Sequence, residues 1–203
     1  ATLHREQGIP AAINSGDYLL GAGYRIVSAL PGVDATTLRD VVGILADAHV
    51  RLAKGQGAEL WWRDAAAKRL TPDEALAIYG LKTSPAFEAA IAMGVRLAGV
   101  VPSNAAAIDR YAMHVGTGFQ VLNDLKDWGG DLENDRRVAG DLLGGRPTLL
   151  WALAMERLTP RDAARLREIA AVARRSDRPR DTASLVAEAR TLYERARVVP
   201  QAR

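Results

Sequence analysis

Apolar side chains return every three to four residues through most of the chain, which is the spacing of one helical face. One such series begins at Leu38 and continues through Val41, Val42, Leu45, Ala48 and Leu52. The alternation of β-branched and polar residues that marks a strand is almost absent. The pattern therefore predicts an all-α fold, with helices at about residues 10–29, 35–62, 72–80, 84–99, 103–128, 147–157, 160–175 and 181–197.

Two short segments carry the signals of helix starts. In Thr71-Pro72-Asp73-Glu74 the threonine suits the cap position, the proline suits the first turn, and the glutamate completes a capping box. The segment from Thr159 to Asp162 repeats this pattern with aspartate in place of glutamate. Residues 129–145 and the arginine-rich residues 174–180 are polar, and we predict solvated loops there. Neither stretch resembles a domain linker, so we expect residues 1–203 to form a single domain.

Composition narrows the class of protein. The chain has 203 residues, of which 48% are hydrophobic and 25% charged, so it can bury one sizeable core. It contains no cysteine, which excludes disulfides, thiolate metal sites and a cysteine nucleophile. A net charge of +3 is too small to indicate a nucleic-acid surface. No apolar run reaches the roughly 18–20 residues of a membrane span, and no signal segment begins the chain, so we expect a cytoplasmic protein.

A polar stripe stands out in the predicted helix at 103–128. Gln120, Asn123, Asp124 and Asp127 are three or four residues apart and therefore share one face. Carboxylates near a helix C-terminus are disfavoured by the helix dipole, and a hard cation such as Mg²⁺ would offset that cost. Because apolar residues at 119, 121 and 122 surround the stripe, we predict that it faces a cavity. The alternative is an ordinary solvated face.

A second candidate is the predicted helix break at Lys82-Thr83-Ser84. A lysine and two hydroxyls beside a helix start suit an anion such as phosphate, although a plain cap with a surface lysine would look the same. A third feature is the pair Gly55 and Gly57 inside a helical pattern. Because glycine weakens a helix by about 1 kcal/mol, we interpret these glycines as sites of close helix–helix contact.

Taken in this order, the segments resemble the trans-isoprenyl diphosphate synthases, the polyprenyl synthetase family. Phe119 to Asp131 resembles the second aspartate-rich motif of that family, FQ-x-x-DD-x-x-D-x-x-GD. Lys82-Thr83 resembles its lysine–threonine pair, and Arg137 stands where the family usually has a lysine that contacts diphosphate. Further matches are Gly55-Gln56 with Glu59 for GQ-x-x-D, Gly145 to Leu149 for GK-x-TL, and His4 to Asp17, ending in N-x-GD, for the segment after RRG-x-P.

Two departures from the family pattern are visible. The first aspartate-rich motif and the RRG-x-P arginines are missing, and the sequence has no Asp-Asp pair. The match begins in the middle of the family pattern, so we expect this chain to lack an N-terminal helical block. Asn123 replaces the first aspartate of the second motif. An amide oxygen can ligate Mg²⁺ but carries no charge, so metal affinity should be weaker.

The resemblance implies a helical bundle of the isoprenoid synthase type and a Mg²⁺-dependent prenyltransferase, working as a homodimer. Such an enzyme ionises an allylic prenyl diphosphate, adds isopentenyl diphosphate and loses a proton, for which pyrophosphate is the plausible acceptor. It further implies that Asn123, Asp124 and Asp127 bind the metal. Diphosphate binding falls to Lys82, Gln120 and Arg137, and catalytic roles fall to Lys82, Thr83 and Gln120.

The resemblance further implies an apolar tunnel. Met113, Phe119, Gly116 and Gly118 are candidates for its lining, although a core position is the more frequent role for such a methionine and phenylalanine. We interpret the tryptophans at 61, 62, 128 and 151 in the same way, as core or interface.

Three other functions remain open. A class I terpene cyclase on the same fold is one, because such cyclases often place asparagine in the second metal motif and need no site for a second diphosphate. A non-catalytic partner subunit of a prenyl synthase is another, favoured if the gene itself lacks the first aspartate motif. The last is a helical scaffold without a ligand, against which the stripe at residues 120–127 argues.

Overall fold

The computed structural model describes residues 2–65, 69–99, 103–129, 138–175 and 179–202. Within these ranges the chain is helical and contains no strand, as the periodicity predicts. The helices are α1 (Leu3–Glu6), α2 (Ile9–Ser28), α3 (Ala35–Asp64), α4 (Pro72–Lys82), α5 (Ser84–Leu97), α6 (Ala105–Asp127), α7 (Gly140–Leu143), α8 (Leu149–Arg157), α9 (Pro160–Arg175), α10 (Pro179–Arg195) and α11 (Val198–Ala202).

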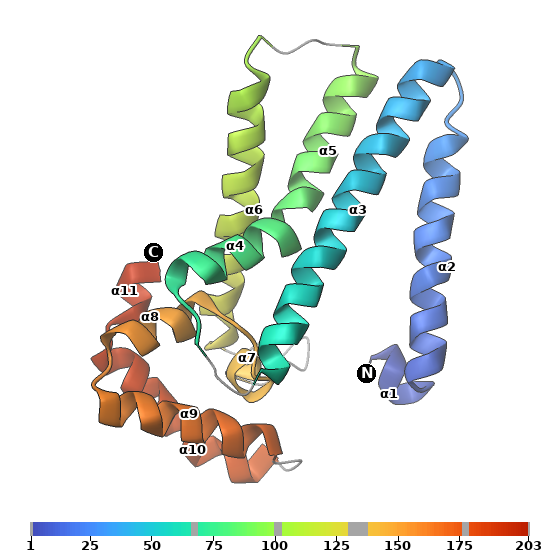
Figure 1. Ribbon diagram of the computed structural model, residues 1–203. Coiled ribbons are helices and arrows are strands. Elements are labelled where there is room, and N and C mark those ends of the chain that lie inside the picture. The colour runs from blue at the N-terminus through green and yellow to red at the C-terminus, as the bar shows by residue number, and fades with distance from the viewer. Residues whose placement is uncertain (1, 66–68, 100–102, 130–137, 176–178, 203) are drawn as a thin grey trace.

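The long helices α2, α3, α5 and α6 run side by side, and α4 crosses the lower part of this layer (Figure 1). Helix α3 packs against both α4 and α5, and α5 packs against α6. The C-terminal helices α7 to α11 gather around the lower end of α6, with α9 and α10 paired. None of the described helices is long and apolar enough to cross a membrane.

Local capping explains where several helices begin. Thr71 accepts a hydrogen bond from the Glu74 N–H, and the Glu74 carboxylate accepts one in return from the Thr71 N–H, which confirms the capping box. Thr159 accepts from the Asp162 N–H at 3.2 Å. Asp34 caps α3 through the N–H groups of Thr36 and Thr37.

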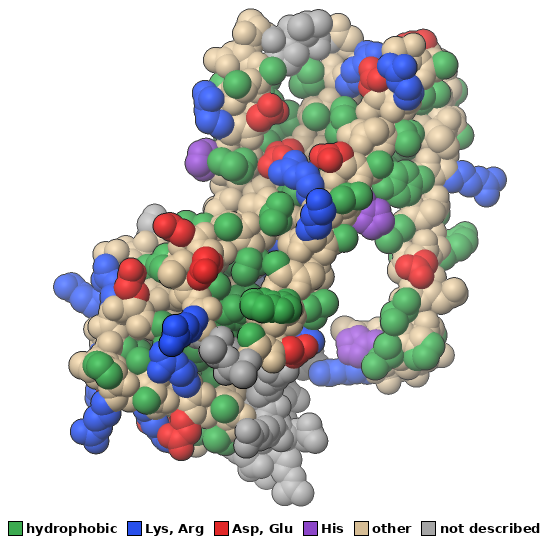
Figure 2. All heavy atoms as spheres, in the orientation of Figure 1, with side chains coloured by type: hydrophobic (Ala, Val, Ile, Leu, Met, Phe, Trp, Pro, Cys, Tyr) green, Lys and Arg blue, Asp and Glu red, His purple; other side chains and the backbone are tan. Residues whose placement is uncertain are grey.

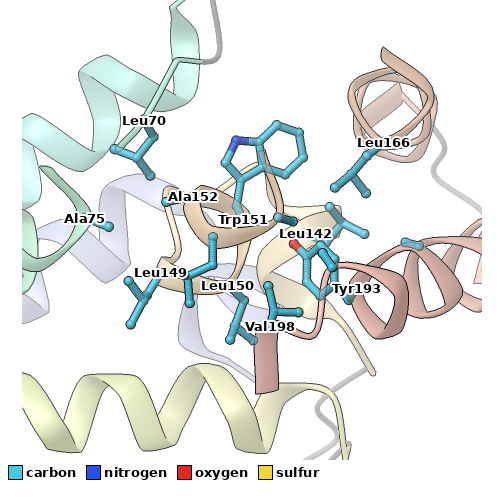
Figure 3. Close-up of a cluster of buried hydrophobic side chains, with 14 of the residues drawn as sticks. Leu70, Ala75, Leu142, Leu149, Leu150, Trp151, Ala152, Leu166, Tyr193 and Val198 are labelled. Atoms are coloured by element: carbon cyan, nitrogen blue, oxygen red, sulfur yellow. The ribbon is translucent and has the colours of Figure 1, made fainter. Parts of the chain in front are cut away.

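The largest apolar cluster surrounds α8. Its first six residues, Leu149 to Ala154, are all buried. Around them lie Leu142 of α7, Leu166 of α9, Tyr193 of α10 and Val198 of α11 (Figure 3). From α3, Trp62 packs edge-on against Trp151 with ring centroids 6.2 Å apart, and its indole N–H donates to the Arg69 carbonyl. The core therefore joins the end of α3 to the C-terminal helices.

The structure also departs from the predicted elements. The region at 129–145 is not loop throughout, because α7 forms at Gly140–Leu143. Helix α9 ends at Arg175, as predicted, but α10 begins at Pro179, two residues earlier than predicted, so residues 174–175 and 179–180 of the expected loop are helical. The short helices α1 and α11 were not predicted. Helices of four or five residues show too little periodicity to be visible in the sequence.

Helix α2 differs from the rest of the layer. None of its residues is buried, and apolar side chains such as Ile13, Leu19 and Ile26 are exposed. Figure 2 shows an opening between the lower half of α2 and the body of the protein. A hydrogen bond between the Tyr24 hydroxyl and His49 Nδ1, at 3.2 Å, links α2 to α3.

Candidate active site

The break between α4 and α5 is held between two other helices. Lys82 ends α4, Thr83 occupies the break, and Ser84-Pro85 starts α5, where proline cannot continue the hydrogen-bond ladder. A side chain on Gly55 of α3 would lie 2.4 Å from the backbone nitrogen of Lys82. One on Gly116 of α6 would lie 2.5 Å from Ser84 Cα. The prediction of close helix contact is confirmed at Gly55 and wrong at Gly57, where an added Cβ would meet nothing within 4 Å. Gly116 makes a close contact of the same kind as Gly55.

Below the break, the polar stripe of α6 contains a buried carboxylate. Asp124 is 2% exposed, and the Tyr79 hydroxyl donates a hydrogen bond to its Oδ2. Gln120 Nε2 donates to its Oδ1 at 3.1 Å, and Thr83 Oγ1 donates to Gln120 Oε1 at 3.0 Å. The Tyr79 hydroxyl in turn accepts from the Leu149 N–H at 2.7 Å. A continuous set of hydrogen bonds therefore runs from the helix break to the start of α8.

Burial changes the acidity of two groups in this set. It raises the pKa of Asp124 to about 6, although the hydrogen bonds from Tyr79 and Gln120 oppose that rise. It raises the pKa of the Tyr79 hydroxyl as well, and the neighbouring Asp124 charge adds to the effect. The tyrosine is therefore a neutral donor to the carboxylate at physiological pH.

Asp127, one turn further along α6, holds the start of α7. Its Oδ2 accepts from the Asp141 N–H at 3.0 Å, and its carbonyl accepts from the Ala139 N–H at 2.9 Å. Burial, together with the nearby Asp141 charge, raises the pKa of Asp127 to about 6, against the hydrogen bonds from Asp141 and Gly140. Asn123 is partly exposed and shares the α6 face of Asp127, four residues away.

Two cations lie beside these carboxylates. Lys82 donates to Glu59 of α3, which is buried. Arg146 lies 4.0 Å from the other oxygen of Glu59 and pairs with Asp141 at 2.9 Å. The site thus combines side chains of α3, α4, α6 and α7 with one from the segment before α8.

Most of the predicted site residues come together. Lys82, Thr83, Gln120 and Asp124 are linked or adjacent as just described, and Asn123 and Asp127 continue the same stripe. The N-x-GD element at 14–17 lies on exposed parts of α2. Arg137, and the Gly-Asp pair at 130–131, lie outside the described residues.

The prediction that apolar neighbours bury the helix around the stripe is only partly right. Val121 is buried, but Leu122 is 65% and Phe119 49% exposed. Phe119 packs against Phe87 of α5 with ring centroids 5.6 Å apart. Met113 is exposed too, so the expected core positions for Met113 and Phe119 are wrong. The sequence shows that these residues are apolar, but whether another helix covers them depends on the packing.

Two residues of the site were missed. Tyr79 lies three residues before Lys82 on α4, a helical spacing that places both on one side, and this was an available signal. Asp141 contributes through its N–H to Asp127 and through its carboxylate to Arg146. Its partners are fixed by the position of α7, which the sequence did not predict.

The oxygen donors of the stripe fit a hard cation. Among the described residues, no three histidine, aspartate or glutamate side chains are grouped as a protein-only metal site would need. Mg²⁺ is commonly bound by one or two protein oxygens and completes its shell with water and substrate phosphate. Asn123 and Asp127 could supply such a pair, because they share one face of α6 and both are partly exposed. Asp124 already accepts a hydrogen bond on each oxygen.

The sequence is similar to a known protein family and to curated relatives. The family model described as Polyprenyl synthetase matches residues 1–189. The short chain isoprenyl diphosphate synthase of Methanothermobacter thermautotrophicus is 27% identical over 194 residues, which are 95% of this chain and 56% of that protein. IDS-like terpene synthase 3 of Melampsora lini is 29% identical over 146 residues, 70% of this chain and 44% of that protein.

A solved structure shares the fold. The crystal structure of geranylgeranyl pyrophosphate synthetase from Pyrococcus horikoshii superposes with a TM-score of 0.82 at 25% identity, covering 99% of this chain and 58% of that one. The chain thus spans about half the length of the curated relatives it matches.

Proposed function

The chain belongs to the polyprenyl synthetase family, and from this premise we propose that the protein condenses an allylic prenyl diphosphate with isopentenyl diphosphate to give a longer trans-prenyl diphosphate. The observation that carries the proposal is the hydrogen-bonded set of Thr83, Gln120 and Asp124 beside the Lys82 cation. It joins the lysine–threonine pair of α4 to the aspartate-rich motif of α6. We further propose a homodimer in the cytoplasm, and a single helical domain over residues 1–203, on the strength of the family pattern.

In this proposal each residue has a distinct task. Lys82 and Arg137 hold the diphosphate, because ammonium and guanidinium groups are its natural partners. Asn123 and Asp127 would hold Mg²⁺, with Asp124 beside them. Bound Mg²⁺ would supply charge neutralisation of the departing diphosphate.

The stripe also has a task next to the reacting carbons. Gln120 is oriented at both ends, by Thr83 at its oxygen and by Asp124 at its nitrogen. A fixed amide dipole beside a developing allylic cation stabilises charge without reorganising during the reaction. The double bond of isopentenyl diphosphate attacks that cation, and the proton then lost goes to pyrophosphate, since the stripe itself offers only amides and hydrogen-bonded carboxylates.

A terpene cyclase is the second candidate. Asn123 in the metal motif favours it, and so does the similarity to a protein named as an IDS-like terpene synthase. In that case the same site would ionise one allylic diphosphate and close it on itself. A non-catalytic partner subunit, from a different class of function, would keep the helical surfaces and lose turnover.

One assay separates these functions. The full-length gene product is incubated with Mg²⁺ and farnesyl diphosphate, with and without isopentenyl diphosphate, and products are analysed by mass. A longer prenyl diphosphate formed only with isopentenyl diphosphate is the expected result. A hydrocarbon or alcohol formed without isopentenyl diphosphate would show that the protein is a cyclase and not a synthase. No product under either condition would favour the partner subunit.

The role of Asp127 is tested in the same assay with Asp127→Asn. Asparagine still accepts the Asp141 N–H and preserves the start of α7, but it removes the charge. We expect Mg²⁺-dependent turnover to fall by at least about a hundredfold. Asp34→Asn is the matched control, because it alters an aspartate cap at the far end of α3 and should leave turnover unchanged.

Retained turnover in Asp127→Asn would remove Asp127 from the metal site. An equal loss in Asp34→Asn would show that a weakened fold, and not a lost ligand, explains the effect.

A further inference from the structure

A buried carboxylate lies behind the two cations of the site. The Glu59 side chain is 7% exposed, against 21% for Lys82 and 54% for Arg146. A ligand arriving from solvent would therefore meet the cations before it met the carboxylate. A buried carboxylate is tolerated only where it is paired, and both oxygens of Glu59 face a cation.

The backbone of α3 explains why Glu59 reaches this place. Gly55 lies one helical turn before Glu59 and packs directly on the backbone of Lys82. Because residues four apart share a helix face, the same contact that brings α3 against α4 also aims Glu59 at the end of α4. The position of the carboxylate relative to Lys82 is thus set by backbone packing and not by flexible side chains.

Glu59 also connects the two halves of the site. Through Arg146 it is linked to Asp141, whose N–H donates to Asp127. The diphosphate-binding side, at Lys82, and the carboxylate side, at Asp127, are therefore joined by one series of polar contacts. A displacement of Glu59 would therefore alter the contacts on both sides.

We infer that Glu59 is a positioning residue, which holds the Lys82 ammonium and the Arg146 guanidinium together so that both face the diphosphate of the substrate. The inference rests on the proposed function. Lysine and arginine side chains lose much rotamer freedom when they are fixed, and an interaction that fixes them beforehand lowers the entropic cost of binding. The carboxylate also repels the diphosphate, but it lies behind the cations, so ordering dominates.

The test measures binding of inorganic pyrophosphate in the presence of Mg²⁺ to the full-length gene product, by titration calorimetry. Glu59→Gln keeps the size and the acceptor atom but removes the charge, and we expect pyrophosphate to bind about tenfold more weakly. Glu59→Asp keeps the charge and should recover most of the affinity. Lys82→Met should lose most of it.

Glu88→Gln is the matched control. Glu88 is a partly buried carboxylate on α5 that pairs with Arg51 of α3, outside the site, so its loss removes a comparable ion pair. We expect this variant to lose thermal stability to a similar extent as Glu59→Gln and to bind pyrophosphate as tightly as the native protein. The contrast separates positioning from a general loss of stability.

The outcomes distinguish the inference from the function on which it rests. If Lys82→Met loses binding while Glu59→Gln binds as tightly as the native protein or more tightly, the positioning role is overturned and the proposed function stands. If the native protein does not bind pyrophosphate, both are overturned. If Glu88→Gln loses as much pyrophosphate affinity as Glu59→Gln, the positioning role is also overturned.

Discussion

Tyr79 and Asp124 are 45 residues apart in sequence and share one buried hydrogen bond. The carboxylate is kept from solvent, and its acidity falls because the charged form loses hydration that two hydrogen bonds only partly replace. Single residues of the stripe therefore differ in what they can do. Asp124 orders Gln120, whereas Asn123 and Asp127 have the exposure that a metal ligand needs.

The raised pKa of Asp124 has a consequence for stability. Its ordinary value is 3.8 and its folded value about 6, so the folded protein binds the proton more tightly than the unfolded chain. The stabilisation that protonated Asp124 gives the fold is therefore fully present below about pH 4. It is lost as the pH rises from about 4 to 6, and it is absent above that range. The full effect is roughly 2–3 kcal/mol.

Asp124→Asn removes this titration. We compare the free energy of unfolding of the variant with that of the native protein at each pH. The variant should become more stable relative to the native protein by roughly 2–3 kcal/mol as the pH rises from 4 to 8. Urea denaturation at several pH values, with a chelator present to remove divalent metal, measures the difference. A constant offset between the two proteins at every pH would contradict the assigned acidity.

Asn123 supports a second prediction at this scale. Asn123→Asp adds a negative charge to the proposed ligand pair, so Mg²⁺ should bind more tightly, by roughly tenfold. Isothermal titration calorimetry of the metal-free protein with Mg²⁺ measures the change in affinity. The Asn104→Asp variant serves as control because it adds the same charge to the other end of α6. Unaltered or weaker Mg²⁺ binding in Asn123→Asp would count against Asn123 as a ligand.

At the scale of elements, the site depends on how closely three helices approach. Gly55 of α3 and Gly116 of α6 each leave room for the backbone at the α4–α5 break. This proximity places Thr83 within reach of Gln120 and Lys82 within reach of Glu59. The glycines are therefore part of the site although they carry no chemistry.

The two glycines of α3 form a matched pair for testing this contact. In Gly55→Ala the added Cβ would meet the Lys82 backbone, which cannot move aside as a flexible side chain could, so we expect a loss of about 3 kcal/mol. Gly57→Ala meets nothing within 4 Å and should gain about 0.5–1 kcal/mol from better helix propensity. Chemical denaturation of both variants measures the difference, and similar effects in the two would contradict the close contact.

At the scale of the whole molecule, the apolar core lies to one side of the long helices. It is built around α8 and reaches α3 through Trp62, whereas α2 contributes no buried residue. Cooperative unfolding should therefore depend on the α8 region far more than on the outer surface of the layer. Figure 2 shows how loosely the lower half of α2 approaches the body.

Adjacent tryptophans test this distribution. Trp62 is 5% exposed and packs on Trp151, so Trp62→Ala should destabilise the protein by about 3–5 kcal/mol. Trp61 is 76% exposed, and Trp61→Ala should change stability by less than about 0.5 kcal/mol. Thermal unfolding followed by circular dichroism compares the two. An equal loss would mean that the exposed face of α3 is covered in the native protein.

The longer helices, the polar stripe and the lysine–threonine break can all be predicted from the sequence alone. The predicted helix at 103–128 is observed at Ala105–Asp127, and the Thr71 capping box is present. These features depend on residues within one or two helical turns of each other. Their hydrogen bonds and periodicity are therefore visible in a short stretch of sequence. The family motifs likewise use short spacings.

How these segments contact one another is visible only in the folded protein. Glu59 lies between Lys82 and Arg146, Asp127 holds the start of α7, and Phe119 remains exposed on a helix whose Val121 is buried. Such contacts join residues tens of positions apart and depend on the distance and rotation of whole helices. A local pattern shows that a side chain is apolar or charged, but the packing of its neighbours decides whether it is buried and with what it pairs.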